Sequence, residues 1–337
     1  MTTAVLDTGA ARHPAGRPDT TRRAVGVASA ALGGAAVALQ SRTNGDLSIH
    51  LRDGLAAATI SFGTGLLLLL IAVPATRRGR LGLAGVRAAL RARTLRPWHC
   101  LGGVCGAGLV LTQSMTVAVI GVAGFTAAMV AGQSGGGLLA DRLGAGSAGP
   151  QPFTLARVAG AALAVAAVLV AVADRLTSPT SLGLVLLPVL AGAGIAWQQA
   201  VNGRVRAAAG SAATAAFISF LAGTAALLPA FGIDVWIRGV PTGRLPNQPW
   251  LYLGGALGVL VITLSAAMVR HTGVLLLGLG MIAGQLLGAV VIDVVAPAGA
   301  GPTPLTLTGA GMTLLAVLIA AVGRAQPAMD RPDGSHR

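Results

Sequence analysis

Long apolar runs separated by short polar stretches dominate the chain. A helix that crosses a bilayer needs about 20 mostly apolar residues. Ten segments meet this length: 24–43, 55–75, 98–118, 121–141, 155–173, 181–201, 212–233, 250–269, 272–293 and 305–323. The third and fourth are almost continuous, and Gly121 and Gly124 are the expected break between them. The pattern predicts an all-α integral membrane protein with ten transmembrane helices.

The polar stretches between these runs set the predicted boundaries. Residues 1–23 form a basic tail that we expect to be disordered, and residues 324–337 form a second tail. Residues 174–180 link a first five-helix unit at 24–173 to a second at 181–323.

Composition narrows the class of protein. Of the 337 residues, 54% are hydrophobic and 10% are charged, whereas a soluble domain carries about 25% charged residues. The net charge of +14 comes from arginines that flank apolar runs, so it indicates membrane orientation and argues against a nucleic-acid partner. The chain has no lysine and no glutamate, which excludes a Schiff-base lysine and a catalytic glutamate.

The arginines also predict the topology. Loops on the side of the N-terminal tail hold 18 arginines, and the opposite loops hold five. Because Lys and Arg gather in cytoplasmic loops, both termini are expected in the cytoplasm. Seven of the 18 lie in the basic, amphipathic segment 77–96. That pattern fits a short surface helix touching anionic lipids, and equally a plain charged loop.

The two halves of the chain repeat one another. A shift of 158 residues places Gln40 on Gln198, Asn44 on Asn202 and Phe62 on Phe220. A shift of 152 residues relates Pro97 to Pro249, Trp98 to Trp250, Met129 to Met281, Gln133 to Gln285 and Asp141 to Asp293. Each half has five predicted spans, an odd number, so the second half must cross the membrane in the opposite direction. Inverted repeats of this kind are the architecture of secondary transporters.

The repeated motifs resemble a known family. The element A-x-Q-x3-N-G occurs at 38–45 and 196–203, and each copy is followed by A-x-I-S-F, at 58–62 and 216–220. Together they resemble the YdcZ-type inner-membrane exporters of the drug/metabolite transporter (EamA-like) superfamily, in a fused two-repeat form covering about 24–323. The resemblance implies a ten-helix fold with cytoplasmic ends, a multi-pass location in the inner membrane of a bacterium, and secondary transport, but no particular solute.

Two glutamines are the main candidates for a solute site. Gln133 and Gln285 lie about 12 residues into their spans, which is near the midplane of the bilayer. Glycines flank each of them at small-xxx-small spacing, which favours close helix packing: Gly132 and Gly136, Gly284 and Gly288. The amides either face a central cavity or serve as hydrogen bonds between helices.

A second polar pair lies nearer the ends of the first and sixth spans. Gln40 and Asn44 are four residues apart, as are Gln198 and Asn202, so each pair shares a helix face. For the asparagines we favour helix C-caps, because Asn-Gly adopts the left-handed conformation easily. For the glutamines a solute contact or a gate is as good a reading as packing.

The remaining candidates have no symmetric polar partner or lie at span ends. Trp197, Gln199 and Gln113 are unpaired and either fit a solute or pack. His99 and His271 are interpreted as packing or interfacial residues. Asp293 and Asp141 are the carboxylates close to the hydrocarbon region and the weaker candidates for proton coupling.

These residues favour a secondary transporter of a small organic solute, which works as an exporter by alternating access. A passive channel would need a continuous polar stripe, and a scaffold gives no reason for symmetric midplane amides. No nucleophile–base set, nucleotide-binding motif or metal-ligand spacing is present, so we expect no enzyme, no cofactor and no metal. The oligomer is left open between a monomer and a homodimer.

Overall fold

The computed structural model describes residues 20–145, 155–172, 179–296 and 303–322, and all regular structure in these ranges is helical. The α-helices are α1 (Thr20–Leu51), α2 (Gly54–Ala75), α3 (Arg77–Arg91), α4 (Gly102–Arg142), α5 (Leu155–Val172), α6 (Pro179–Ala209), α7 (Ala212–Arg238), α8 (Gly254–Val295) and α9 (Pro304–Val322). Two 3-10 turns, η1 (Pro97–Leu101) and η3 (Pro249–Tyr252), precede α4 and α8 at repeat-related positions. Residues 20–23 of the predicted N-terminal tail belong to α1, so that boundary is wrong. Residues 1–19, the C-terminal tail 324–337 and most of the linker 174–180 lie outside the described residues.

Four stretches in the described part are long and apolar enough to cross a bilayer: Gly54–Ala75, Pro97–Ala140, Gly183–Ala209 and Ala212–Arg238. Val158–Ala167 and Met281–Val295 are shorter apolar helices. The chain is therefore an all-helical protein with several spans, and the count of ten stays a prediction.

The helix α4 is broken where the sequence predicts it. Gly121 has φ +76° and ψ 166° inside α4, a conformation that glycine adopts without a Cβ penalty. The predicted break at Gly121 is confirmed, and the second half of α4 begins at Val122.

The helix α1 does not end at Asn44, so the C-cap interpretation of the two asparagines is wrong. α1 continues to Leu51 and α6 continues past Asn202 to Ala209. The left-handed residues that follow these helices are Arg52 (φ +52°) and Gly210 (φ +61°). Packing in the interior holds the Asn44-Gly45 step helical, because a Cβ on Gly45 would already touch Val117 of α4.

The basic segment forms a helix, so the alternative of a plain loop is wrong. In α3 the buried residues Gly79, Gly82 and Val86 face the protein, and Val86 packs in a cluster with Val205 of α6 and Ala215 of α7. All seven arginines of residues 77–96 are exposed. The buried side of α3 therefore covers the end of α6 and the start of α7, whereas Leu81 of α3 is exposed.

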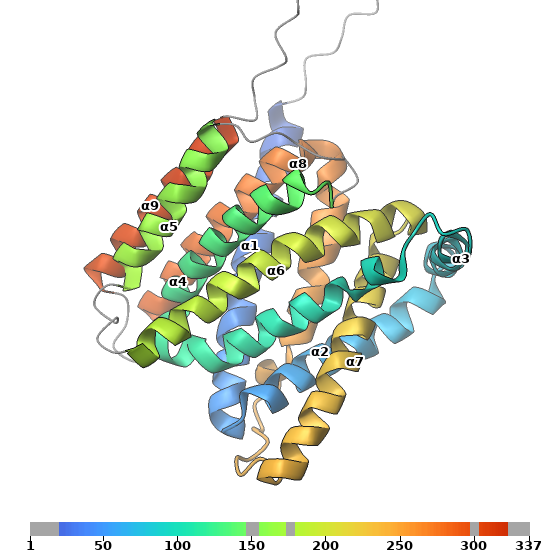
Figure 1. The fold of residues 1–337 in the computed structure, drawn as a ribbon, viewed down its shortest axis with the longest axis horizontal. Helices are drawn as coiled ribbons and strands as arrows, with labels where there is room; N and C mark the ends of the chain where they lie inside the picture. The colour runs from blue at the N-terminus through green and yellow to red at the C-terminus, as the bar shows by residue number, and fades with distance from the viewer. Residues whose placement is uncertain (1–19, 146–154, 173–178, 297–302, 323–337) are drawn as a thin grey trace, which may run out of the picture.

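The helices pair across the two halves of the chain. The most extensive contacts join α1 to α8, α4 to α6 and α5 to α9. Figure 1 shows α5 and α9 side by side at one edge of the bundle, and α3 at the opposite edge. Helices α1, α2, α4, α6, α7 and α8 lie between these two edges (Figure 1). The candidate glutamines and asparagines lie on α1, α4, α6 and α8.

Candidate functional site

The four predicted glycines lie where helices of opposite halves touch. On α4, a Cβ at Gly132 or Gly136 would overlap the backbone of Val189 or Ala193 in α6. On α8, a Cβ at Gly284 or Gly288 would meet the backbone of Ala31 or Ala35 in α1. The shift of 158 residues relates Ala31 to Val189 and Ala35 to Ala193, so the two contacts are equivalent. In each of these helix pairs, α4 with α6 and α8 with α1, the backbones of the two helices are therefore in direct contact at the glycines.

A pair of phenylalanines lies between α2 and α7. The rings of Phe62 and Phe220 have centroids 5.0 Å apart, and both side chains are 5% exposed. Each ring lies against a glycine of the other helix, Phe220 against Gly65 and Phe62 against Gly223. The contact between α2 and α7 is therefore apolar, and the two halves contribute to it equally.

Gln40 and Gln198 flank this apolar centre. The Gln40 amide and the Phe220 ring both lie within van der Waals reach of a Cβ at Gly258. The Gln198 amide lies against Gly106 in the equivalent way. Gln198 is 9% exposed, and its Oε1 is buried without a hydrogen-bond partner. An unpaired buried acceptor is costly, and it leaves this amide able to accept a hydrogen bond.

Asn44 and Asn202 connect neighbouring helices. The Asn202 Oδ1 accepts from the Ser219 Oγ at 2.9 Å, which joins α6 to α7. The Asn44 Nδ2 donates to the Gln113 Oε1 at 2.7 Å, and the Gln113 Nε2 donates to the Ser41 Oγ at 2.9 Å. Gln113 is fully buried. This chain of bonds ties α1 to α4 in the first half, and sequence symmetry gave no sign of it because Gln113 has no glutamine counterpart.

Gln133 and Gln285, predicted near the midplane, lie on α4 and α8, which contact each other. Gln285 is 5% exposed, and its Nε2 lies 3.9 Å from the Met129 Sδ of α4. Gln133 is half-buried next to Gly132. A thioether is a weak acceptor, so the Gln285 amide keeps most of its hydrogen-bonding capacity for another group.

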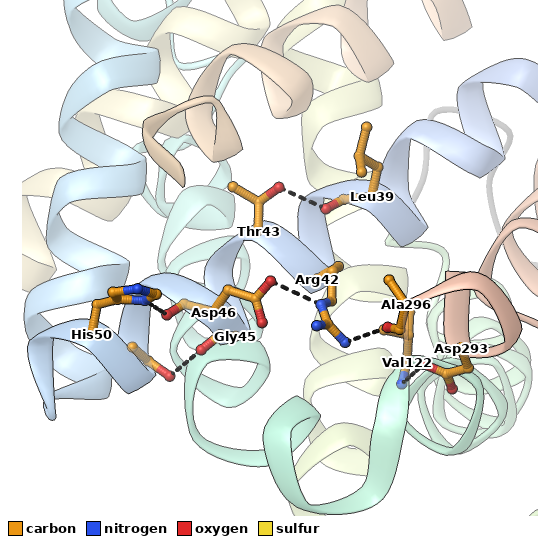
Figure 2. Close-up of polar contacts among 10 residues, drawn as sticks. Leu39, Arg42, Thr43, Gly45, Asp46, His50, Val122, Asp293 and Ala296 are labelled. Atoms are coloured by element: carbon orange, nitrogen blue, oxygen red, sulfur yellow. Dashed lines mark hydrogen bonds and ion pairs between the residues drawn. The ribbon is translucent and has the colours of Figure 1, made fainter. Parts of the chain in front are cut away.

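Asp293 is buried and binds the break in α4. Its side chain is 3% exposed. One carboxylate oxygen accepts the Val122 N–H at 3.1 Å and the other accepts the Ala123 N–H at 2.8 Å, as Figure 2 shows for Val122. Asp293 thus caps the half-helix that follows Gly121. The side chain of its repeat partner, Asp141, lies outside the described residues.

Two arginines bind the ends of α8 and α4. The Arg42 guanidinium donates to the Ala296 carbonyl at 2.8 Å and to Asp46 at 2.8 Å (Figure 2). Arg204 donates to the Gly144 and Ala145 carbonyls, each at 2.7 Å. Gly144 and Ala296 are related by the shift of 152 residues, but Arg204 aligns with Asp46 and not with Arg42. Sequence comparison of the halves missed these arginines because they are offset by one helical turn.

Trp197 lies against Trp98 of η1. Their rings stack with centroids 5.9 Å apart. His99 is buried, and its Nδ1 accepts the Arg96 N–H at 3.0 Å, which fits its interpretation as a packing residue. The side chain of His271 lies outside the described residues. Cys100 and Cys105 are free, and the described ranges hold no group of three potential metal ligands.

Comparison with known proteins identifies the family. The model of the family described as "Putative inner membrane exporter, YdcZ" matches twice, at residues 25–170 and 183–323. The chain belongs to the YdcZ family. The two matches show that it carries two family units, which confirms the fused form expected from the repeat.

The chain was also compared with curated proteins and with solved structures. No curated protein matches the chain. One solved crystal structure of a protein is 20% identical and covers 90% of this chain and 97% of its own, at a TM-score of 0.47, from which we draw nothing.

Family membership makes this YdcZ protein a multi-pass protein of the inner membrane that belongs to an exporter family and not to an enzyme family. Its apolar helices agree with that placement. The candidate residues are therefore best judged by what they can do for a solute that crosses the bilayer.

Proposed function

We propose that this YdcZ protein is a secondary transporter that exports a small organic solute by alternating access. Its proposed architecture is ten transmembrane helices in two inverted five-helix repeats, at 24–173 and 181–323, with both termini in the cytoplasm. Exchange of the conformations of the two halves would open the centre first to one side and then to the other.

The observation that carries this proposal is the reciprocity of the contacts between the halves. Gly132 of the first half packs on α6, and Gly284 of the second half packs on α1. The Phe62 and Phe220 rings likewise exchange the glycines that they cover. Two halves that meet through equivalent surfaces have two conformations of similar energy available, which alternating access requires.

The proposed solute contacts are Gln40 and Gln198, which flank the two phenyl rings, and Gln133 and Gln285 on α4 and α8. Amides supply donors and acceptors without the cost of a buried charge. Trp197 is a weaker candidate because Trp98 covers it. Asn44 and Asn202 are better assigned to joining helices, since each already bonds a neighbouring helix.

Solute efflux tests the proposal. Growth of a strain lacking this protein is compared with growth of a strain that expresses it, on a panel of toxic organic compounds. Flux of the compounds that separate the two strains is then measured in proteoliposomes. We expect saturable flux that needs an ion gradient or counter-solute. Single-channel currents in planar bilayers would instead indicate a channel, and no change with any compound would favour a scaffold.

The inverted topology has its own test. Reporter fusions after residues 96 and 337 should lie in the cytoplasm, and a fusion at 243 should lie outside. The two loops at 76–97 and 239–248 are related by the repeat, so finding both on one side would overturn the inverted arrangement.

We also propose that α3 binds anionic lipid headgroups on the cytoplasmic side. Its arginines are exposed, while Val86, Ala89 and Leu90 pack in the cluster with α6 and α7. Each arginine is worth about 1 kcal/mol near an anionic surface. Replacement of Arg87 and Arg91 by Gln should weaken stabilisation of the purified protein by added anionic lipid. Equal stabilisation by a zwitterionic lipid would contradict the assignment.

A further inference from the structure

Gln198 of α6 carries a buried hydrogen-bond acceptor without a donor in the described part of the chain. The residue is 9% exposed, and its Oε1 has no hydrogen-bond partner. Leaving a buried acceptor unpaired costs free energy, because the group has lost its hydrogen bonds to water and gained none in return. A ligand that brings an N–H or O–H group to this oxygen would restore the missing hydrogen bond.

Two glycines of α4 lie against the Gln198 side chain. A Cβ at Gly106 would lie 2.9 Å from the Gln198 Oε1, and a Cβ at Gly102 would lie 3.4 Å from its Cγ. The two glycines are four residues apart and therefore share one face of α4. Because this face presents only backbone to the amide, a small movement of α4 away from α6 would give a ligand access to the Oε1.

An aromatic ring lies beside the same start of α4. A Cβ at Gly223 of α7 would meet both the Phe62 ring and the Gly103 carbonyl, and Gly103 lies between the two glycines that face Gln198. The other half repeats this arrangement, with the amide of Gln40 and the second phenyl ring at one point of α8. An aromatic ring favours stacked or edge-to-face contact with another flat ring, so the ring and the amide together suit a flat solute with a donor group.

The surroundings of Gln198 carry no charge among the described residues. The helix α2 has no charged residue, and α4 has none in Gly102–Ala140. On α6, Arg204 donates to two backbone carbonyls beyond the end of α4. On α7, Asp234 and Arg238 pair with each other near the end of the helix. Since a buried ion without a partner is strongly disfavoured, the position suits a neutral ligand.

We infer that the solute is a neutral molecule that combines a flat apolar part with an N–H or O–H donor, and that Gln198 selects it. The Gln198 Oε1 accepts the hydrogen bond from the donor, and the flat part lies on the Phe62 ring. The inference rests on the proposed function, because it names the class of solute that the proposed exporter carries. It excludes carboxylates and quaternary ammonium ions from this position.

Protection of a native thiol tests this class of solute without transport. Cys105 precedes Gly106 on α4, and its Sγ would lie 3.6 Å from a Cβ at Gly194, one turn before Gln198 on α6. The chain has two cysteines, so Cys100→Ala leaves Cys105 as the single thiol. Its rate of reaction with N-ethylmaleimide is measured in the purified full-length protein with and without a probe. A probe bound between α4 and α6 lowers this rate.

Four probes share a phenyl ring and differ in the group attached to it. Benzamide has N–H donors, N,N-dimethylbenzamide has an acceptor alone, benzoate is an anion and benzyltrimethylammonium is a cation. We expect benzamide to protect Cys105 at a concentration about tenfold lower than N,N-dimethylbenzamide, because it alone pairs the buried acceptor. Benzoate and benzyltrimethylammonium should give no protection.

The Gln198→Met variant connects this preference to the amide. Methionine has a similar length and only a weak acceptor, so the two neutral probes should protect Cys105 at equal concentrations in this variant. The matched control is Gln199→Met, which changes the exposed neighbour and should keep the tenfold difference.

Equal protection by the two neutral probes in the parent overturns the inference, and so does protection by either charged probe or no protection by benzamide. A tenfold difference that persists in Gln198→Met overturns the role of Gln198. If Gln198→Met does not fold, the parent series decides alone. The two proposals fail separately: selective protection without flux of any compound contradicts the transporter, whereas flux of charged or donor-free compounds alone contradicts this class of solute.

Discussion

Phe62 of α2 and Phe220 of α7 lie with their ring centroids 5.0 Å apart, and each ring fills the space above a glycine of the opposite helix. The glycines, Gly65 and Gly223, are one turn after the phenylalanines, so α2 and α7 exchange a ring for a gap in both directions. The contact is also part of a larger apolar cluster that includes Leu69 and Leu227. This arrangement makes the α2–α7 crossing depend on the absence of two Cβ atoms.

Gly65→Ala should therefore destabilise the protein, because the new methyl group overlaps the Phe220 ring. We expect a loss of about 1–3 kcal/mol, as for other overpacked interiors. Gly63→Ala is the matched control, because a Cβ there meets open space, and it should be neutral or stabilising by about 0.5–1 kcal/mol. Thermal unfolding of the purified protein measures both, and equal melting temperatures would contradict the tight crossing.

Gly132→Leu and Gly284→Leu should separate α4 from α6 and α8 from α1. In each case the side chain would enter the backbone of the partner helix. We expect strongly reduced folded yield and a lowered melting temperature for each. Gly135 lies three residues after Gly132 on α4, and a Cβ there meets open space. The control variant Gly135→Leu should therefore fold normally. Normal folding of both Gly132→Leu and Gly284→Leu would show that these glycine faces do not hold the helix pairs together.

Arg52→Gly should stabilise the protein. Arg52 follows α1 with φ +52°, and the repeat places Gly210, with φ +61°, at the equivalent position after α6. A residue with a Cβ is strained there, so we expect a gain of about 0.5–1 kcal/mol for Arg52→Gly and a loss of similar size for Gly210→Ala. Gly210 has open space around it, so its loss would report backbone strain alone. A melting temperature that moves in the same direction for both variants would argue against this reason.

The midplane amides should matter for transport more than for folding. Gln133→Ala and Gln285→Ala each remove one hydrogen-bonding group worth about 0.5–1.5 kcal/mol, and about 2 kcal/mol when the solute group is left without a partner. We therefore expect flux in proteoliposomes to fall roughly three- to thirty-fold at equal protein levels. Gln199→Ala, on an exposed position of α6, is the control and should leave flux unchanged. Unchanged flux in the double Gln133/Gln285 variant would reduce these residues to contacts between helices.

The sequence by itself determined the features that depend only on residues close together in the chain: the helices, the break in α4, the repeated motifs and the glycine faces. Apolar runs predict the helices, and the glycines at 121 and 124, midway along a run too long for one crossing, predict the break that α4 has at Gly121. The repeated motifs identify the family and its fused form. The small residues around Gln133 and Gln285 indicate a close-packed face, since a glycine face has few other uses inside a helix.

Contacts between distant segments decided the rest. The Asn44-Gly45 step reads as the end of a helix, yet α1 continues because the asparagine bonds Gln113 of α4 and the glycine packs on Val117. Asp293 reads as a residue at the end of a span, yet it binds a half-helix about 170 positions earlier in the chain. Arg42 and Arg204 reach the ends of α8 and α4 from unequal repeat positions. A sequence states which groups a helix carries, whereas the partner of a buried polar group is chosen by whichever donor or acceptor the fold brings within about 3 Å of it.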